Sequence, residues 1–225
     1  MTFSLVARCA RTGALGMAVS SSSPAVAARC AHARAGAGAV ATQNITDPSL
    51  GPKGLDLLAS GWSAEDAMTR LKAMAAHADY RQLMLIDAEG RTAVFSGRHT
   101  LGTHAHAQGT DVVAAGNMLR HAGVPVAVVA AFEAAADRHL GDRLVAAMQA
   151  GRDAGGEAGP VHSAGMLIVD RVAWPVADLR VDWTEGDPIA ELAALWRLWK
   201  PQMDDYVRRA LDPSAAPAYG VPGDP

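Results

Sequence analysis

The first twenty-one residues constrain the fold of this chain more than any other stretch. Residues 2–9 and 14–21 are rich in apolar and β-branched side chains, and Arg11-Thr12-Gly13 between them is typical of a chain reversal. A third extended run follows at residues 38–43. The pattern predicts a β-hairpin that begins at Thr2, so we expect Thr2 at a fixed position in a sheet rather than on a loose tail.

Thr2 is also a candidate nucleophile. A small residue after an initiator Met generally permits removal of that Met, and Thr2 would then carry a hydroxyl and a free α-amine. A Thr hydroxyl activated by its own N-terminal amine is a recognised nucleophile, and an amine pKa of about 7.7–8.0 suits a base near neutral pH. An ordinary N-terminal strand has the same pattern, so the stretch alone leaves catalysis open.

Composition excludes several classes of protein. A formal net charge of −3 gives no footprint for nucleic acid or for an anionic membrane. No run of about 18 apolar residues is present, and the N-terminus has no basic flank before an apolar core, so we expect a cytoplasmic protein. Cys9 and Cys30 are too few for a disulfide framework and are expected to be buried thiols.

The 225 residues, half of them hydrophobic, suffice for one large core. We expect one domain over residues 1–207 and a disordered Pro-, Ala- and Gly-rich tail over 208–225. Trp196 and Trp199, on the apolar side of the last predicted helix, fit either a core or a dimer contact. We expect a homodimer or higher homo-oligomer.

The remaining elements alternate between strands and helix pairs, which predicts an α+β fold with helices covering a sheet system. The predicted strands are residues 83–87, 92–96, 111–115, 163–169 and 179–182. The predicted helices are a short one at 55–58 and longer ones at 63–75, 125–136, 142–150 and 187–199, with Ser63 and Asp66 capping the second. Residues 97–109 are interpreted as a loop, and residues 151–160 as a glycine-rich connection.

No glycine-rich phosphate loop joins a strand to a helix, so no nucleotide cofactor is expected. His99, His104 and His106 provide a metal alternative, because His-x-His on a strand places both imidazoles on one face. A third ligand with clear spacing is missing, so we expect neither a metal nor another cofactor, and keep a metal-dependent hydrolase as an alternative.

Polar residues at the expected strand ends are site candidates. Ser20 and Ser21 end the second strand beside the start of the first, and Asn117 follows a strand and a glycine. An Asn side chain in such a place donates either to an oxyanion or to substrate, or simply stabilises a turn. Gln43 and Asn44 are candidates of the same kind, at the end of the third strand.

Several motifs in this order resemble a bacterial family that is catalogued as domain of unknown function 1028. The resemblance covers nearly the whole chain to about residue 200. It rests on residues 2–8, 16–20, 33–43, 47–55, 116–119, 162–164 and 179–182. That family is placed with the N-terminal nucleophile (Ntn) hydrolases, the superfamily of proteasome subunits and penicillin acylases.

The resemblance implies a four-layer αββα sandwich and hydrolysis of a C–N bond in a small amide or ureido metabolite, with Thr2 as nucleophile and its amine as base. It also implies that Arg34 is the basic residue beside the nucleophile. Asp153 and Ser163 resemble the acid and serine that support the nucleophile in proteasome-like chains. Apart from the resemblance, His106 is a candidate to line the substrate pocket, as the alternative to a metal ligand. The expected partner is a small-molecule substrate; the alternative is a non-catalytic small-molecule-binding or assembly protein of the same fold.

Overall fold

The computed structural model describes residues 1–221 and shows a mixed α+β fold with two antiparallel sheets and helices. The first sheet has six strands in the order β10-β9-β2-β1-β8-β7. Its strands are β1 (Thr2–Arg8), β2 (Leu15–Ser21), β7 (Ala105–Gly109), β8 (Val112–Asn117), β9 (Ser163–Val169) and β10 (Ala177–Val181). The predicted N-terminal hairpin is confirmed, and β1 lies in the middle of the sheet between β2 and β8.

The second sheet has four strands in the order β3-β4-β5-β6. They are β3 (Ala31–Arg34), β4 (Gly38–Asn44), β5 (Arg81–Asp87) and β6 (Thr92–Ser96). One apolar cluster lies between the two sheets, where Val6 and Met17 of the first sheet pack with Ala41 and Met84 of the second. The inner faces of the sheets therefore share one core.

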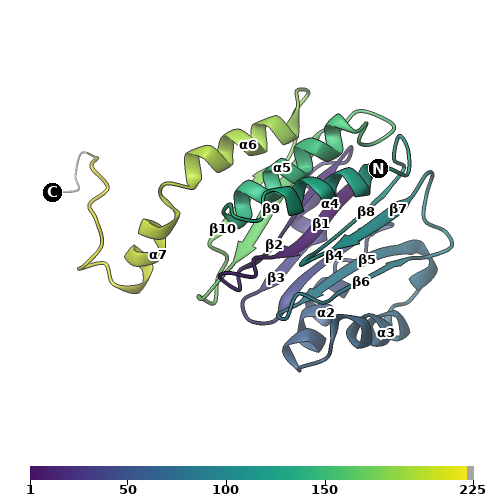
Figure 1. Ribbon diagram of the computed structural model, residues 1–225, viewed down its shortest axis with the longest axis horizontal. Coiled ribbons are helices and arrows are strands. Elements are labelled where there is room, and N and C mark those ends of the chain that lie inside the picture. The colour runs from purple at the N-terminus through teal and green to yellow at the C-terminus, as the bar shows by residue number, and fades with distance from the viewer. Residues whose placement is uncertain (222–225) are drawn as a thin grey trace.

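Helices cover the outer faces of both sheets (Figure 1). On the six-stranded sheet lie α4 (Val124–Ala134) and α5 (Leu140–Asp153), with α6 (Pro188–Trp199) beside them. On the four-stranded sheet lie α2 (Leu50–Ala59) and α3 (Ala64–Met74). The short helices α1 (Val26–Cys30) and Ala78–Tyr80 complete the body, and α7 (Met203–Leu211) extends away from it.

The predicted helices and strands all occur near their expected positions, whereas five elements were missed, among them the short helix Ala78–Tyr80. The loop interpreted at 97–109 contains the edge strand β7, whose sequence Ala-His-Ala-Gln-Gly has no β-branched residue. The helix α1 and the strand β3 lie in a stretch left unassigned. In α7, Met203 is the only buried residue, so its polar sequence gave no core-facing pattern.

The expected domain boundary at residue 207 falls inside α7, so residues 208–211 of the expected tail are helical. Residues 212–221 have no helix or strand, and residues 222–225 lie outside the described part of the chain. Trp196 is buried and donates to Asp142, and Trp199 donates to the Val176 carbonyl oxygen, so both indoles pack inside the chain. Within the described residues, no helix combines the length and apolar character needed to cross a bilayer.

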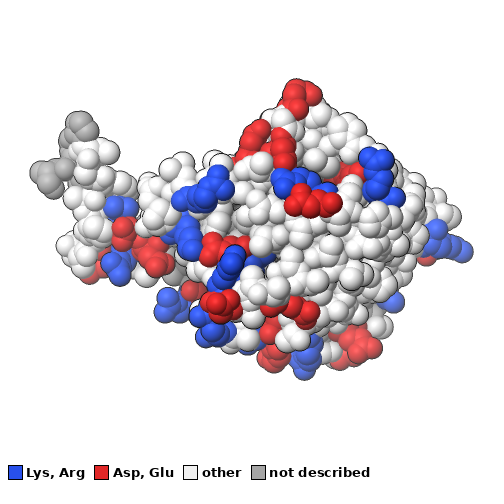
Figure 2. All heavy atoms as spheres, turned by 45° about the horizontal axis from the view of Figure 1, so that its top comes forward, with Lys and Arg blue, Asp and Glu red and all other residues white. Residues whose placement is uncertain are grey.

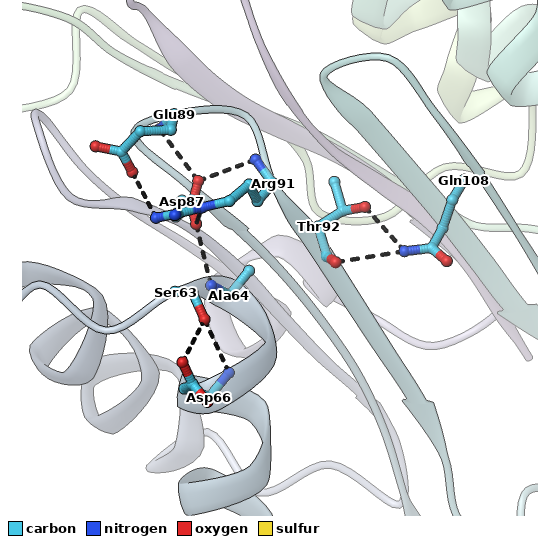
Figure 3. Close-up of polar contacts among 8 residues, drawn as sticks. All are labelled: Ser63, Ala64, Asp66, Asp87, Glu89, Arg91, Thr92 and Gln108. Atoms are coloured by element: carbon cyan, nitrogen blue, oxygen red, sulfur yellow. Dashed lines mark hydrogen bonds and ion pairs between the residues drawn. The ribbon is translucent and has the colours of Figure 1, made fainter.

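One buried carboxylate, Asp87, ties the β5–β6 turn to α3 (Figure 3). Its oxygens accept hydrogen bonds from the backbone N–H groups of Ala64 (3.0 Å), Glu89 (3.1 Å) and Arg91 (2.9 Å). The Arg91 guanidinium adds a fourth bond of 2.7 Å. The predicted cap of α3 is confirmed nearby, where Ser63 accepts from the Asp66 N–H. Asp87 therefore fixes two elements with one side chain.

We expect Asp87→Ala to lower the free energy of unfolding by about 3 kcal/mol, because it leaves buried N–H donors without an acceptor. Urea denaturation measures the loss. The matched control is Glu89→Ala, which removes an exposed carboxylate whose ion pair, among the described residues, is with Arg91, and it should cost under about 1 kcal/mol. Equal losses in the two variants would contradict the role given to Asp87.

Candidate active site

Thr2 begins the central strand β1 and lies opposite Ser21 on one side and Asn117 on the other. Alternate strand residues share a face, so the Thr2 side chain lies on the same face as Ser4 and Val6, which points toward the second sheet. Only 7 % of Thr2 is exposed. The hydroxyl predicted as nucleophile therefore lies at the rim of the space between the sheets, held by two neighbouring strands.

A chain of hydroxyl groups begins at Thr2. Thr2 Oγ1 and Ser21 Oγ both donate to the Met1 carbonyl oxygen, at 2.5 Å and 2.6 Å, and lie 3.3 Å from each other. Ser21 Oγ is 2.8 Å from Ser23 Oγ. The Arg29 guanidinium donates to Ser23 Oγ and to the Pro24 carbonyl oxygen. A fixed positive charge is thus connected through two serines to the carbonyl group beside Thr2.

Amide side chains link the two sheets on the other side of Thr2. Asn117 donates to Gln82 Oε1 at 3.2 Å, and Gln43 donates to the same oxygen at 2.8 Å. Gln43 in turn accepts from Ser4 Oγ at 2.6 Å. These four side chains are almost fully buried. The Asn117 Oδ1 atom has no hydrogen-bond partner among the described residues, although it is buried.

Glu157 brings a buried carboxyl group to the same end of the sheet. Only 4 % of it is exposed, and its Oε2 accepts from the Ser22 N–H at 3.1 Å. Burial raises the pKa of Glu157 to about 8, and the Met1 α-amino group, the Ser22 N–H and the Ser20 hydroxyl offset part of that rise. Neither Glu157 Oε1 nor Ser20 Oγ has a hydrogen-bond partner of normal geometry within the described chain.

Some of the predicted site residues do meet at this place. Ser20, Ser21, Gln43, Asn117 and Ser163 all lie at the Thr2 end of the sheets. Ser163 is directly opposite Ser21; it donates to the Ser23 carbonyl oxygen at 2.6 Å and accepts from the Val26 N–H at 3.3 Å. It therefore holds the serine-rich turn rather than Thr2 itself.

The other predicted residues lie elsewhere. Arg34 is opposite Gly38, at the far end of β4 from Gln43, and forms an exposed ion pair with Asp56 at 2.8 Å. Asp153 is exposed and paired with Arg152. The structure thus corrects the expectation that Arg34 is the basic residue of the site, because the turn of β3 into β4 carries it away, and the arginine connected to Thr2 is Arg29.

Asn44 and the histidines have structural surroundings of their own. Asn44 donates to the Tyr80 carbonyl oxygen at 2.7 Å and accepts from the Leu101 N–H at 3.1 Å, so it fixes two loops. His106 is exposed on the edge strand β7, and His99 stacks on Tyr80. Among residues 1–221 no group of three or more His, Cys, Asp or Glu side chains is arranged to hold a metal ion.

Sequence reasoning missed Ser23, Arg29, Gln82 and Glu157. Ser23 carried a usable signal, because the run Ser20-Ser21-Ser22-Ser23 concentrates hydroxyl groups beside the first strand. Gln82 stands before an apolar strand and signals nothing by itself. Glu157 lies in the glycine-rich connection, and its burial depends on contacts with residues more than a hundred positions away.

We expect the carboxyl of Glu157 to make stability fall with rising pH in the chain that carries Met1. Its folded pKa of about 8 exceeds the ordinary glutamate value of 4.5, so the folded protein keeps a proton that the unfolded chain releases. That stabilisation is complete below about pH 4.5 and is lost as the pH rises to about 8, at up to about 1.4 kcal/mol per pH unit.

Urea denaturation at several pH values measures this slope. Glu157→Gln, which has no titrating carboxyl, should lose the slope, whereas the exposed control Glu65→Gln should keep it. An unchanged slope in Glu157→Gln would contradict the assignment.

Comparison with known proteins identifies the family of this chain. A family model described as a family of unknown function (DUF1028) matches residues 2–192. The crystal structure of protein SPO2555 from Silicibacter pomeroyi, of the same family model, is similar at 31 % identity and a TM-score of 0.84, over 92 % of this chain and 90 % of that one. The structure of Anbu (ancestral beta-subunit) from Yersinia bercovieri is a more distant match, at 12 % identity and a TM-score of 0.42. The match covers 92 % of this chain and 97 % of the Anbu chain. No curated protein matches. From the family match and the solved relative, we conclude that the chain belongs to the DUF1028 family.

Proposed function

We propose that this protein is an N-terminal nucleophile amidohydrolase, with Thr2 as nucleophile after cleavage of the Met1–Thr2 bond, and that its two sheets and flanking helices form the four-layer αββα sandwich of that class. The observation that carries the proposal is the position of the Thr2 hydroxyl. It lies at the start of the central strand, almost buried, and 2.5 Å from a carbonyl oxygen that Ser21 also hydrogen-bonds. The two strands thus hold the hydroxyl beside a carbonyl group, where a threonine nucleophile would act.

The reaction then proceeds as a two-step acyl transfer. Thr2 Oγ1 attacks the amide carbon, and its proton passes to the freed α-amine of Thr2, directly or through one water. The amine returns the proton to the leaving nitrogen as the C–N bond breaks. Water hydrolyses the resulting Thr2 ester and restores the free hydroxyl. No metal ion or organic cofactor is needed for these steps.

The carbonyl oxygen of Met1 accepts hydrogen bonds from the hydroxyl groups of Thr2 and Ser21. We infer that the substrate carbonyl oxygen takes the same place and receives the Ser21 hydrogen bond. Because Arg29 donates to Ser23, which is linked to Ser21, the cation polarises the chain of hydroxyls toward that oxygen. The negative charge that develops on the oxygen during attack is thereby stabilised.

The space for substrate is the place now taken by Met1. A β-carbon at Gly159 would lie 2.7 Å from the Met1 methyl carbon, so Met1 fills the gap beside that glycine. Its removal would open a small cleft next to Thr2, which supports a small amide or ureido compound as substrate. The surface drawn in Figure 2 mixes Lys and Arg with Asp and Glu and has broad uncharged areas, so that face has no single-sign charged patch.

We expect the purified protein to lack Met1. We also expect Thr2→Ala to lower the rate of amide hydrolysis by at least about 10³-fold, because the variant has no nucleophilic hydroxyl beside its amine. Intact mass gives the state of Met1. Periodate treatment confirms a free Thr2, since it cleaves an N-terminal amino alcohol but not an internal threonine. A panel of small amides and ureides then compares wild type, Thr2→Ala and the conservative control Thr2→Ser.

Two results would contradict the proposal. One is a protein that keeps Met1 and resists periodate, which would favour the binding or assembly alternative. The other is activity that survives in Thr2→Ala.

We expect Arg29→Met to lower kcat/KM by about 10- to 100-fold, because one polarising charge is worth about 1.4–3 kcal/mol in such a site. Steady-state kinetics on the most active amide of the panel measures the effect. The matched control is Arg34→Met, whose ion pair with Asp56 lies at the other end of β4. Similar losses in both variants would show that Arg29 has no special connection to the site.

A further inference from the structure

Glu157 is a buried carboxyl group that the mechanism above does not use. Its Oε2 is satisfied by the Ser22 N–H, but its Oε1 is buried without a hydrogen-bond partner in the described part of the chain. Such an acceptor costs free energy unless a donor reaches it. The hydroxyl oxygen of Ser20, 0 % exposed, is unpartnered in the same way. The chain with Met1 attached therefore leaves two buried oxygen atoms, Glu157 Oε1 and Ser20 Oγ, without a hydrogen bond of normal geometry.

These acceptors lie across the beginning of β1. Because Thr2 is opposite Ser21 and Asn117, the position before Thr2 lies between Ser22 and Met118. Glu157 binds Ser22 and forms a bridge with Leu119, and the Ala158 N–H donates to the Met118 carbonyl oxygen at 2.9 Å. The backbone of residues 157–158 thus closes the strand end from which a free amine at Thr2 would project.

Within residues 1–221, one positive charge stands out near Glu157. Among the charged groups of the described residues, only the α-amino group of the chain lowers its pKa by Coulombic attraction. Arg152 is paired with Asp153 and Asp187, at 2.8 and 2.6 Å. The side-chain carbons of Arg120 lie over Gly155. A group with a positive charge and more than one N–H donor would fit both buried oxygen atoms.

We propose that Glu157, assisted by Ser20, binds the α-ammonium group of Thr2 after cleavage of the Met1–Thr2 bond and positions that group beside the Thr2 hydroxyl. This inference rests on the function proposed above. An ammonium group carries three N–H donors, so it supplies what Glu157 Oε1 and Ser20 Oγ lack. Glu157 acts as a positioning residue: it touches the amine, and the amine does the chemistry.

This contact has a measurable consequence. A carboxylate close to an ammonium group raises the pKa of that group by about 1–3 units, whereas burial alone lowers it. We therefore expect the Thr2 amine to titrate above its ordinary range of about 7.7–8.0. Amide hydrolysis should rise with pH over the same interval, because the amine acts as a base only when unprotonated.

The test follows the Thr2 amine directly, without a substrate. Processed protein labelled with 13C-threonine is titrated from about pH 6 to about pH 10, and the Thr2 Cβ signal, assigned by its absence in Thr2→Ser, reports the midpoint. We expect a wild-type midpoint above about 8 and a midpoint lower by about one unit or more in Glu157→Gln. The matched control Glu65→Gln, an exposed carboxyl on α3, should titrate like wild type.

A wild-type midpoint at or below about 7.7 would overturn the inference without any variant, which covers the case in which Glu157→Gln fails to fold. So would equal midpoints in wild type and Glu157→Gln. In either case a periodate-sensitive Thr2 would leave the proposed hydrolase standing. Protein that retains Met1 would overturn both proposals together.

Discussion

The pairing of β1 with two neighbours is the constraint on which the rest of the structure depends. Because β2 and β8 both bond to β1, the first residue of the strand is held from two sides. A residue at the end of a strand ordinarily frays, since little opposes its conformational entropy. Here two ladders of hydrogen bonds oppose it, and Thr2 gains a fixed orientation between Ser21 and Asn117.

Along β1, the side chains between the two sheets change from apolar to polar, and the polar end is the candidate site. Farther along the strand the space between the sheets is filled by apolar side chains such as Val6, Met17 and Met84. At the Thr2 end the same space holds Ser4, Gln43, Gln82 and Asn117. Buried amides are tolerated when they bond to one another, which these do across the two sheets. The polar end thus ties the sheets together where chemistry is proposed to occur.

The sequence predicted the elements better than it predicted their neighbours. Strong alternation and apolar runs identified β1, β2, β4 and β8, and hydroxyl or amide residues at the ends of β2, β4 and β8 pointed to Ser21, Gln43 and Asn117. Those signals are local. Arg34 was placed by resemblance alone, and the register of β3 on β4 puts it opposite Gly38 and away from Thr2. Glu157 shows the converse: a glycine-rich stretch is typical of a flexible connection, yet a backbone bridge to Leu119 fixes this residue and the Ser22 N–H binds its buried carboxyl group.

The chain that carries Met1 has the energetics of an incomplete site. Glu157 is held in a place where its ionised form is unfavourable, and its free oxygen, like those of Ser20 and Asn117, lacks a donor. Each such group costs free energy in the folded state, so a sequence selected only for stability would replace or satisfy it. Asn117 lies opposite Thr2 and Ser20 opposite Phe3, and Glu157 binds the neighbouring Ser22 N–H, so all three lie near the point where cleavage of the Met1–Thr2 bond would create a new amine. Such an amine would supply N–H donors to these buried oxygen atoms, which supports the nucleophile site proposed above.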